Sequence, residues 1–123
     1  MTNQEIGKLG EDAAANLLIE KGYTILERNY RVNHLEVDII ALKDNFLVFV
    51  EVKTRAVNYL VSPQEAVNYQ KQKYIANAAN SYIRRFRRTE EARLDVITVL
   101  HKNGAVVEVE HIENAYYPRV RTY

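Results

Sequence analysis

The first predicted element is a helix that follows a capping box. In Thr2-Asn3-Gln4-Glu5, the threonine hydroxyl and the glutamate carboxylate can each satisfy a free amide at a helix start. Apolar residues then recur at three- and four-residue spacing from Ile6 to Leu18, and Gly22 supplies a left-handed stop. The pattern predicts a helix from about Asn3 to Lys21.

Three strands are expected after this helix. The stretches Tyr23 to Tyr30, Leu35 to Leu42 and Phe46 to Lys53 are short, and the latter two are rich in Val, Ile and Phe. Lys43-Asp44-Asn45 separates these two and predicts a tight turn, because Asp and Asn tolerate positive φ and bond back to their own backbone. The second and third strands therefore form a hairpin, and their nearly continuous apolar runs indicate burial on both faces.

A second capping box, Ser62-Pro63-Gln64-Glu65, carries proline at the first helical position, where a missing amide costs nothing. It predicts a helix from about Pro63 to the arginine cluster Arg84-Arg85-Phe86-Arg87-Arg88. Leu94 to Leu100 and Ala105 to Ile112 then form a second hairpin around Asn103-Gly104.

This order of helix, three strands, helix and two strands predicts an α/β fold with a central mixed five-stranded sheet flanked by helices. A right-handed crossover through the second helix sets the fourth strand parallel to the third. We expect one domain over residues 1–115 and a C-terminal tail over residues 116–123, because no linker divides the chain.

Composition narrows the chemistry. The 123 residues include no cysteine, which excludes disulfides, thiolate nucleophiles and zinc fingers, so a metal site must use oxygen or imidazole ligands. The three histidines do not form a ligand spacing. The formal net charge is only +1, so the position of the charges matters more than their sum. We expect a cytoplasmic protein without a membrane partner, since the apolar runs are short and the first residues do not resemble a signal peptide.

Charged residues interrupt the central hairpin on one face. If Asp44-Asn45 is a two-residue turn, Asp38 faces Glu51 and Glu36 faces Lys53. Opposed like charges destabilise a sheet, so a cation is expected between the two acids, and oxygen ligands suit Mg²⁺ or Mn²⁺. Lys53 on the same face could then stabilise charge on an attacked phosphate.

Two further acids bear on this interpretation. Glu11 lies beside the apolar stripe of the first helix and is a candidate third acid at the site, because a buried lone carboxylate needs a partner. Glu36 and Lys53 have a simpler alternative, an ordinary cross-strand ion pair. Against a purely structural interpretation stands Asp38 opposite Glu51 in strands that are otherwise apolar.

Several segments together resemble a known family. The pattern of Asp38 followed by Glu51-Val52-Lys53 resembles the PD-(D/E)XK nuclease superfamily, which has a restriction endonuclease-like core. The wider match resembles the YraN-like family of small bacterial proteins, which has no established function and is similar to archaeal Holliday junction resolvases. It spans about Ile6 to Ala115 and includes the segments Gly10-Glu11, Ala13-Ala14, Asn29-Tyr30-Arg31, Glu36 to Ala41, Phe49 to Arg55, Pro63 to Val67 and Arg93 to Ile97.

The resemblance implies roles at individual positions. Asp38 and Glu51 would be metal ligands for Mg²⁺ or Mn²⁺, Lys53 the catalytic lysine, and Glu11 an additional catalytic acid on the first helix. Glu36 would be an accessory acid. The family usually has glycine where this chain has Leu35, and a leucine there would alter the strand entry or narrow access for substrate.

A nucleic acid substrate needs cations near these acids, because phosphate contacts by Lys and Arg supply most of the sequence-independent affinity. In the predicted helix, residues 84, 87 and 88 share one face, so three guanidiniums could follow one phosphate backbone. Alternatively, the run only complements the helix dipole. The candidate contacts are Arg31, Arg55, Lys71, Lys73, Arg84, Arg85, Arg87 and Arg88.

These features support three hypotheses. The first is a metal-dependent endonuclease-like protein that hydrolyses phosphodiester bonds in DNA. The second is a nucleic-acid-binding module that keeps the fold without catalysis. The third is an interaction protein that forms a homodimer through an open sheet edge and the tyrosine-rich tail.

Overall fold

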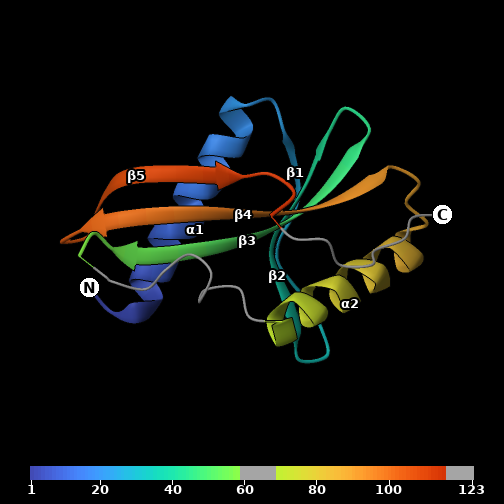
Figure 1. Cartoon of the computed structure of the whole chain (residues 1–123), viewed down its shortest axis with the longest axis horizontal. Coiled ribbons are helices and arrows are strands. Elements are labelled where there is room, and N and C mark those ends of the chain that lie inside the picture. The colour runs from blue at the N-terminus through green and yellow to red at the C-terminus, as the bar shows by residue number, and fades with distance from the viewer. Residues whose placement is uncertain (59–68, 116–123) are drawn as a thin grey trace.

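The structure is a computed structural model that describes residues 1–58 and 69–115. Two helices and five strands follow one another in the predicted order (Figure 1). Their bounds are α1 Asn3–Glu20, β1 Thr24–Val32, β2 Leu35–Lys43, β3 Phe46–Ala56, α2 Tyr69–Phe86, β4 Glu91–Lys102 and β5 Ala105–Ile112.

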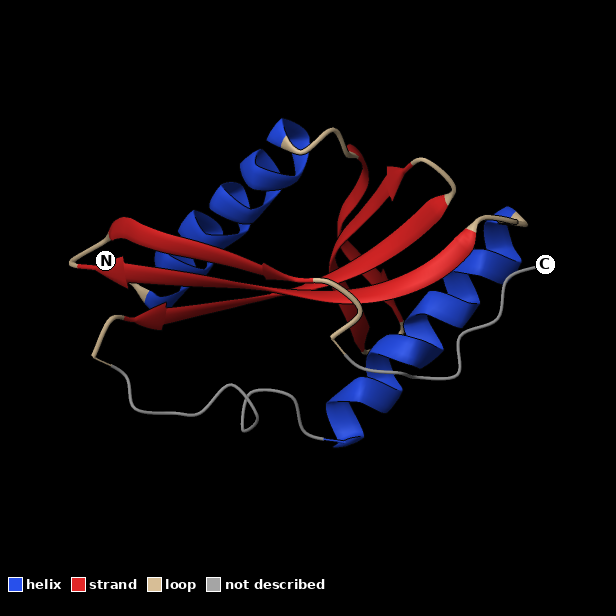
Figure 2. Cartoon of the chain, turned by 45° about the horizontal axis from the view of Figure 1, so that its top comes forward, coloured by secondary structure: helices blue, strands red, loops and turns tan. Residues whose placement is uncertain are grey.

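The strands form one sheet in the order β1-β2-β3-β4-β5. Neighbouring strands are antiparallel except β3 and β4, which are parallel, as the crossover through α2 requires. The helices lie on opposite faces of this twisted sheet (Figure 2). The predicted fold class, a mixed five-stranded sheet with the order of a restriction endonuclease-like core, is confirmed.

The first helix begins and ends through the predicted local signals. The Thr2 hydroxyl accepts a hydrogen bond from the Glu5 amide at 3.1 Å, and the Glu5 carboxylate accepts one from the Thr2 amide at 3.0 Å. Gly22, with a φ of +93°, follows the last turn. Gly10 lets α1 approach β3 closely, because a Cβ at this position would lie 1.8 Å from Thr54 Oγ1.

The predicted start of α2 at Pro63 and the predicted tail lie outside the described residues. The helix ends at Phe86, within the arginine cluster, as expected. The prediction that residues 84, 87 and 88 share one helix face is wrong. Arg87 has left the helix with a φ of +50°, and the Arg88 guanidinium binds both carboxylate oxygens of Glu90 at 3.0 and 2.6 Å.

Each helix covers its own apolar core. On one face, Ile75, Ala79 and Ile83 of α2 pack with Phe49 and Leu94 of the sheet. On the other face, Ala14 and Leu18 of α1 pack with a separate set of strand residues: Ile39, Ala41, Val48, Val50, Ile97 and Val99. Strands β2 and β3 are therefore buried on both faces, as their apolar runs predicted.

A buried polar network joins the α1 side of the sheet to the end of the chain's last hairpin. Asp95 on β4 accepts hydrogen bonds from Arg93 Nε and Nη2, both at 2.9 Å, and from the Asn114 amide at 2.9 Å. His111 Nε2 lies 2.7 Å from Asp95 Oδ2, and Tyr23 accepts a hydrogen bond from Arg93. Every oxygen of this buried carboxylate therefore has a partner.

Candidate functional site

The predicted acids lie where β2 and β3 separate. The paired register runs as expected from Lys43–Phe46 to Ile39–Val50 and stops there. Beyond this point, the Asp38 carboxylate accepts a hydrogen bond from the Val52 amide at 2.8 Å. A side chain thus replaces the backbone acceptor that the departing strand no longer supplies, while β3 continues its pairing with β4.

Strand β2 changes its facing at Asp38. Val37 belongs to the core under α2, whereas Ile39, two residues later, belongs to the core under α1. Residues two apart on a regular strand share a face, so the strand turns over between them. On β1, Asn29 lies between Arg28 and Tyr30, which pair with Ile39 and Val37, and it has a φ of +52°, a conformation that Asn tolerates.

This geometry corrects the predicted cross-strand contacts. Glu36 does not face Lys53; it pairs in register with Arg31, and the Glu36 Oε2–Arg31 Nε distance is 3.3 Å. Asp38 and Glu51 are not a paired position in the sheet. They do line one pocket of about 240 Å³, together with Glu36, Val37, Val50, Lys71 and Ile75.

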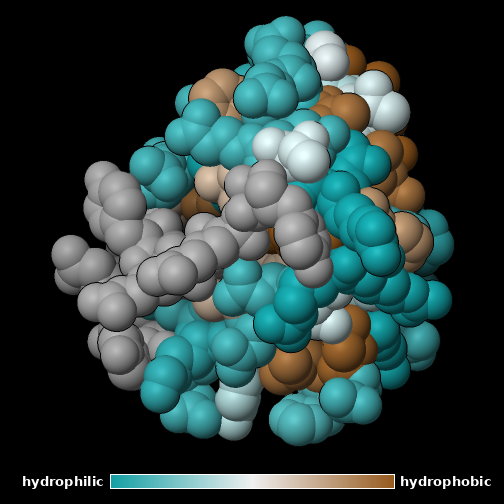
Figure 3. Space-filling model, turned by 90° about the vertical axis from the view of Figure 1, so that its right-hand side faces the viewer, coloured by the Kyte–Doolittle hydropathy of each residue, from teal (hydrophilic) through white to brown (hydrophobic). Residues whose placement is uncertain are grey.

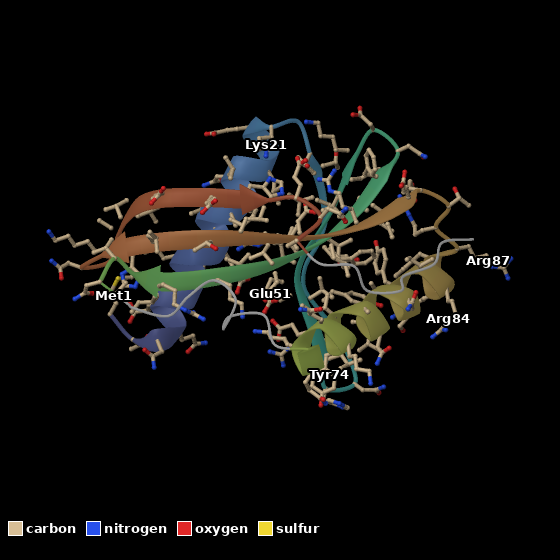
Figure 4. The ribbon with its side chains drawn as sticks, in the orientation of Figure 1. Met1, Lys21, Glu51, Tyr74, Arg84 and Arg87 are labelled. Carbon is tan, nitrogen blue, oxygen red and sulfur yellow. The ribbon has the colours of Figure 1, made fainter. Side chains whose placement is uncertain are left out.

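Glu51 is the most buried of the three acids that line this pocket, and Figure 4 marks its place on the sheet. Its side chain is 4% exposed, and its Oε1 lies 2.9 Å from Lys53 Nζ. Lys71 of α2 contacts the same Oε1 from the helix side. The second oxygen, Oε2, is buried and has no hydrogen-bond partner among the described residues. One half of a buried carboxylate is therefore available to a ligand.

Asp38 has an unusual proton affinity. Burial raises its pKa to about 6, and the hydrogen bond from the Val52 amide only partly opposes this shift. The negative charges of Glu11, Glu51 and Glu36 raise the pKa further. The four acids are thus close enough to interact electrostatically, and the charge of Asp38 also acts on the Lys71 ammonium, which lines the same pocket.

The two lysines at Glu51 differ in their environments. Burial lowers the pKa of Lys53, the nearby Lys71 lowers it further, and Glu51 opposes the shift. Burial also disfavours the charge of Lys71, but its contact with Glu51 outweighs this effect and raises the pKa of Lys71. The Lys53 side chain is 8% exposed, whereas that of Lys71 is 47% exposed.

Glu11 borders a second, wider groove next to the pocket. It lies 4.0 Å from Arg28 Nη2, which also binds Asp12 at 2.8 Å. The groove has a volume of about 830 Å³ and is lined by residues of α1, β1 and β2, among them Lys8, Glu11, Arg28, Arg31 and Glu36. Glu36 lines both cavities and connects them.

The donor set fits a hard cation with few protein ligands. Mg²⁺ is commonly held by one or two carboxylates together with water and substrate phosphates. Asp38 and Glu51 offer two carboxylates on one pocket, and Glu51 Oε2 lacks a partner within residues 1–58 and 69–115. In those same residues, no three His, Asp or Glu side chains are grouped closely enough to hold one ion.

The predicted cationic residues separate into two regions. Lys71 lines the pocket, and Arg55 on β3 binds the Thr54 carbonyl at 2.9 Å. Arg84 and Arg87 lie at the far end of α2 from Glu51, and the face at that end is largely hydrophilic (Figures 3 and 4). The rise of an α-helix places residue 84 about 20 Å along the axis from residue 71.

Sequence reasoning missed two features of the site. Arg28 was not predicted, although the short Asn33-His34 connection sets the β1–β2 register and would have placed an arginine pair, Arg28 and Arg31, beside β2. The contact of Lys71 with Glu51 had no local signal, because it joins a helix to a strand. Leu35 packs against the core under α2, and its effect on access stays a prediction.

Comparisons place the chain among known sequences. No helix in the described part of the chain is long and apolar enough to cross a membrane.

Among the relatives of the chain, a UPF0102 protein of Bacteroides thetaiotaomicron is 45% identical over 116 residues, covering 94% of this chain and 95% of the relative. A UPF0102 protein of Dictyoglomus turgidum is 42% identical over 118 residues, covering 94% and 100%. Residues 10–99 match the uncharacterised protein family UPF0102, and the chain therefore belongs to this family.

Proposed function

We propose that this protein is a divalent-metal-dependent nuclease that hydrolyses phosphodiester bonds in DNA. One observation carries the proposal: the nearly buried Glu51 keeps an oxygen that has no hydrogen-bond partner in the described part of the chain, in a pocket shared with Asp38. A buried polar atom without a hydrogen-bond partner is costly, and buried ionisable groups with perturbed pKa values, such as Asp38 and Lys53, cluster at functional sites. The fold and the resemblance to nuclease-like proteins support the same conclusion.

The residues divide the work as follows. Asp38 and Glu51 would hold the Mg²⁺ or Mn²⁺ ion, which when bound polarises a phosphoryl oxygen and activates water. Lys53 directs its ammonium into the same site, where it can stabilise negative charge on the attacked phosphate. Glu11 and Glu36 act from the edge of the site, because their charges raise the pKa of Asp38.

Nucleic acid would approach along the groove between α1 and β1. Lys8, Arg28 and Arg31 line this groove, which adjoins the pocket at Glu36. Arg55, Lys71 and Lys73 would contact phosphates on the other side of the site. Arg84 and Arg87 would reach only a distant part of a bound substrate, because they lie at the far end of α2 from Glu51 (Figure 4). Arg88, which follows the helix, is already paired with Glu90.

The test is a nuclease assay on purified protein with Mg²⁺ or Mn²⁺ against single-stranded, duplex and four-way DNA. We expect Asp38→Asn, Glu51→Gln and Lys53→Met each to lower the cleavage rate about 100-fold or more. Asp44→Asn is the matched control, because it makes the same chemical change at an exposed turn of the same hairpin. Equal rates in Asp38→Asn and Asp44→Asn would contradict the proposal.

Two outcomes would favour the alternatives. Salt-dependent DNA binding without cleavage, unaffected by metal and by Lys53→Met, indicates a non-catalytic binding module. A dimer in sedimentation experiments, without salt-sensitive DNA binding, indicates an interaction protein.

A further inference from the structure

Two cations meet at one oxygen of Glu51, and they arrive from different elements. Lys53 comes from the same strand and is nearly buried, whereas Lys71 comes from α2 and is about half exposed. Four residues after Lys71, Ile75 lines the same pocket, so one face of α2 closes this side of the site. The exposed lysine is the one that can leave without unfolding the strand.

A divalent ion on Glu51 Oε2 would lie close to the Lys71 ammonium on Oε1, and the two cations would repel each other. Lys53 already supplies one positive neighbour to the same carboxylate. Lys53 stays beside Glu51 in either case, because its side chain is nearly buried and comes from the same strand. Arrival of a second cation therefore acts mainly on Lys71.

We propose that Lys71 is a built-in counter-ion that occupies Glu51 in the metal-free protein and leaves it when a divalent ion binds. The released ammonium then lies at the mouth of the pocket, where a nucleic acid phosphate can accept it. Lys71 thereby couples the two ligands, since phosphate that holds this lysine removes the competitor of the metal. The inference rests on the proposed function, which supplies the metal and the nucleic acid.

Thermodynamic linkage makes this coupling measurable. If DNA raises the affinity for Mn²⁺ through Lys71, Mn²⁺ raises the affinity for DNA by the same factor. Removing Lys71 has two consequences. The free protein binds Mn²⁺ more tightly, and DNA increases that affinity less than it does in the wild type.

The test is Mn²⁺ binding to the full chain without DNA, followed by electron paramagnetic resonance of the free ion. We expect Lys71→Met and Lys71→Gln to bind Mn²⁺ about tenfold more tightly than the wild type. Lys102→Met, which removes the same charge at the exposed far end of β4, should bind within about twofold of the wild type. A second titration with phosphorothioate DNA measures the coupling.

A second measurement uses the wild-type protein and therefore does not depend on the folding of a variant. In nuclear magnetic resonance spectra of protein with ¹³C-dimethylated lysines, Mg²⁺ should shift the Lys71 methyl resonance toward that of an exposed lysine. Unchanged Mn²⁺ affinity in both Lys71 variants, with binding lost in Asp38→Asn, overturns the counter-ion and leaves the metal site. Absence of Mn²⁺ binding in every variant overturns both proposals.

Discussion

Two buried acids on neighbouring strands show how differently one fold can treat a carboxylate. Asp95 on β4 is paired with Val50 of β3, the residue that precedes Glu51. The side chains of the two acids nevertheless point to opposite faces of the sheet. Asp95 is fully buried and has partners from Arg93, His111 and the Asn114 amide. Glu51 is nearly as buried and keeps one oxygen without a partner in the described residues.

The proton affinities follow this difference. Burial alone would raise the pKa of Asp95, but its hydrogen bonds to His111, Arg93 and Asn114 outweigh burial and lower it. Asp38, with one amide donor and three negative neighbours, has its pKa raised to about 6. The hydrogen bonds and charges around each carboxylate, and not burial alone, therefore set the direction of these two pKa shifts.

The largest expected effect on stability is at Asp95, whose carboxylate oxygens all have hydrogen-bond partners. Asp95→Asn should lower the free energy of unfolding by about 3–5 kcal/mol, because it removes the buried carboxylate that binds Arg93 and leaves that charge only the more distant, half-exposed Glu113. Because the folded pKa of Asp95 is lowered, its stabilisation is present above the ordinary value of 3.8 and is lost as pH falls through the folded pKa. Urea unfolding at pH 7 measures the loss, and a change below about 1 kcal/mol would show that the network contributes little.

The opposite change in stability is expected at Asp38, whose pKa is raised by burial and by three negative neighbours. Asp38→Asn should raise the free energy of unfolding at pH 7 by up to about 3 kcal/mol, since it removes a buried charge and keeps an oxygen for the Val52 amide. The folded pKa of Asp38 lies above the ordinary value of 3.8, so its contribution to stability falls as pH rises from about 4 to about 6.

Urea unfolding of the wild type and Asp38→Asn between pH 4 and pH 8 checks this expectation. The gain should be full at pH 7 to 8 and small at pH 4. Asp44→Asn serves as the exposed control and should change stability by less than about 0.5 kcal/mol. A destabilised Asp38→Asn would mean that Asp38 is a structural acid like Asp95.

A divalent metal ion should stabilise the protein through the pocket of Asp38 and Glu51, and not through the network around Asp95. At a Mg²⁺ or Mn²⁺ concentration of about 100 times Kd, the free energy of unfolding of the wild type should rise by about 2.7 kcal/mol. Removal of the ion with EDTA should reverse the gain, and Asp38→Asn should show none of it. Thermal unfolding compares the wild type with metal, the wild type after EDTA, and Asp38→Asn with metal. Equal stabilisation of Asp38→Asn would place the ion elsewhere.

The smallest effects concern the cations outside the pocket. Arg31→Ala should lower the salt dependence of DNA binding by about one phosphate contact, because Arg31 lines the groove beside the site. Arg84→Ala should change it less and should alter stability by less than about 0.5 kcal/mol. Binding isotherms at several salt concentrations compare the two, and a larger effect of Arg84 would move the nucleic acid interface to the end of α2.

Most of the fold was predictable because its signals are local. The Thr2–Glu5 capping box, the stop at Gly22 and the turn at Asn103-Gly104 depend on residues within a few positions of one another. The hairpin register was correct as far as Ile39–Val50. It was wrong beyond that point, where Glu36 pairs with Arg31 rather than Lys53, because the divergence of the strands arises from the twist of the whole sheet.

The candidate site was likewise predictable where its signals are local and not where they depend on contacts between distant elements. The residue types and spacing of Asp38, Glu51 and Lys53 identified the acids and their lysine, since one hairpin carries all three. Only the tertiary structure decided that the Asp38 carboxylate binds the Val52 amide and that α2 brings Lys71 onto Glu51. Those contacts depend on how a helix packs across a twisted sheet, and no short stretch of sequence encodes the distance between two such elements.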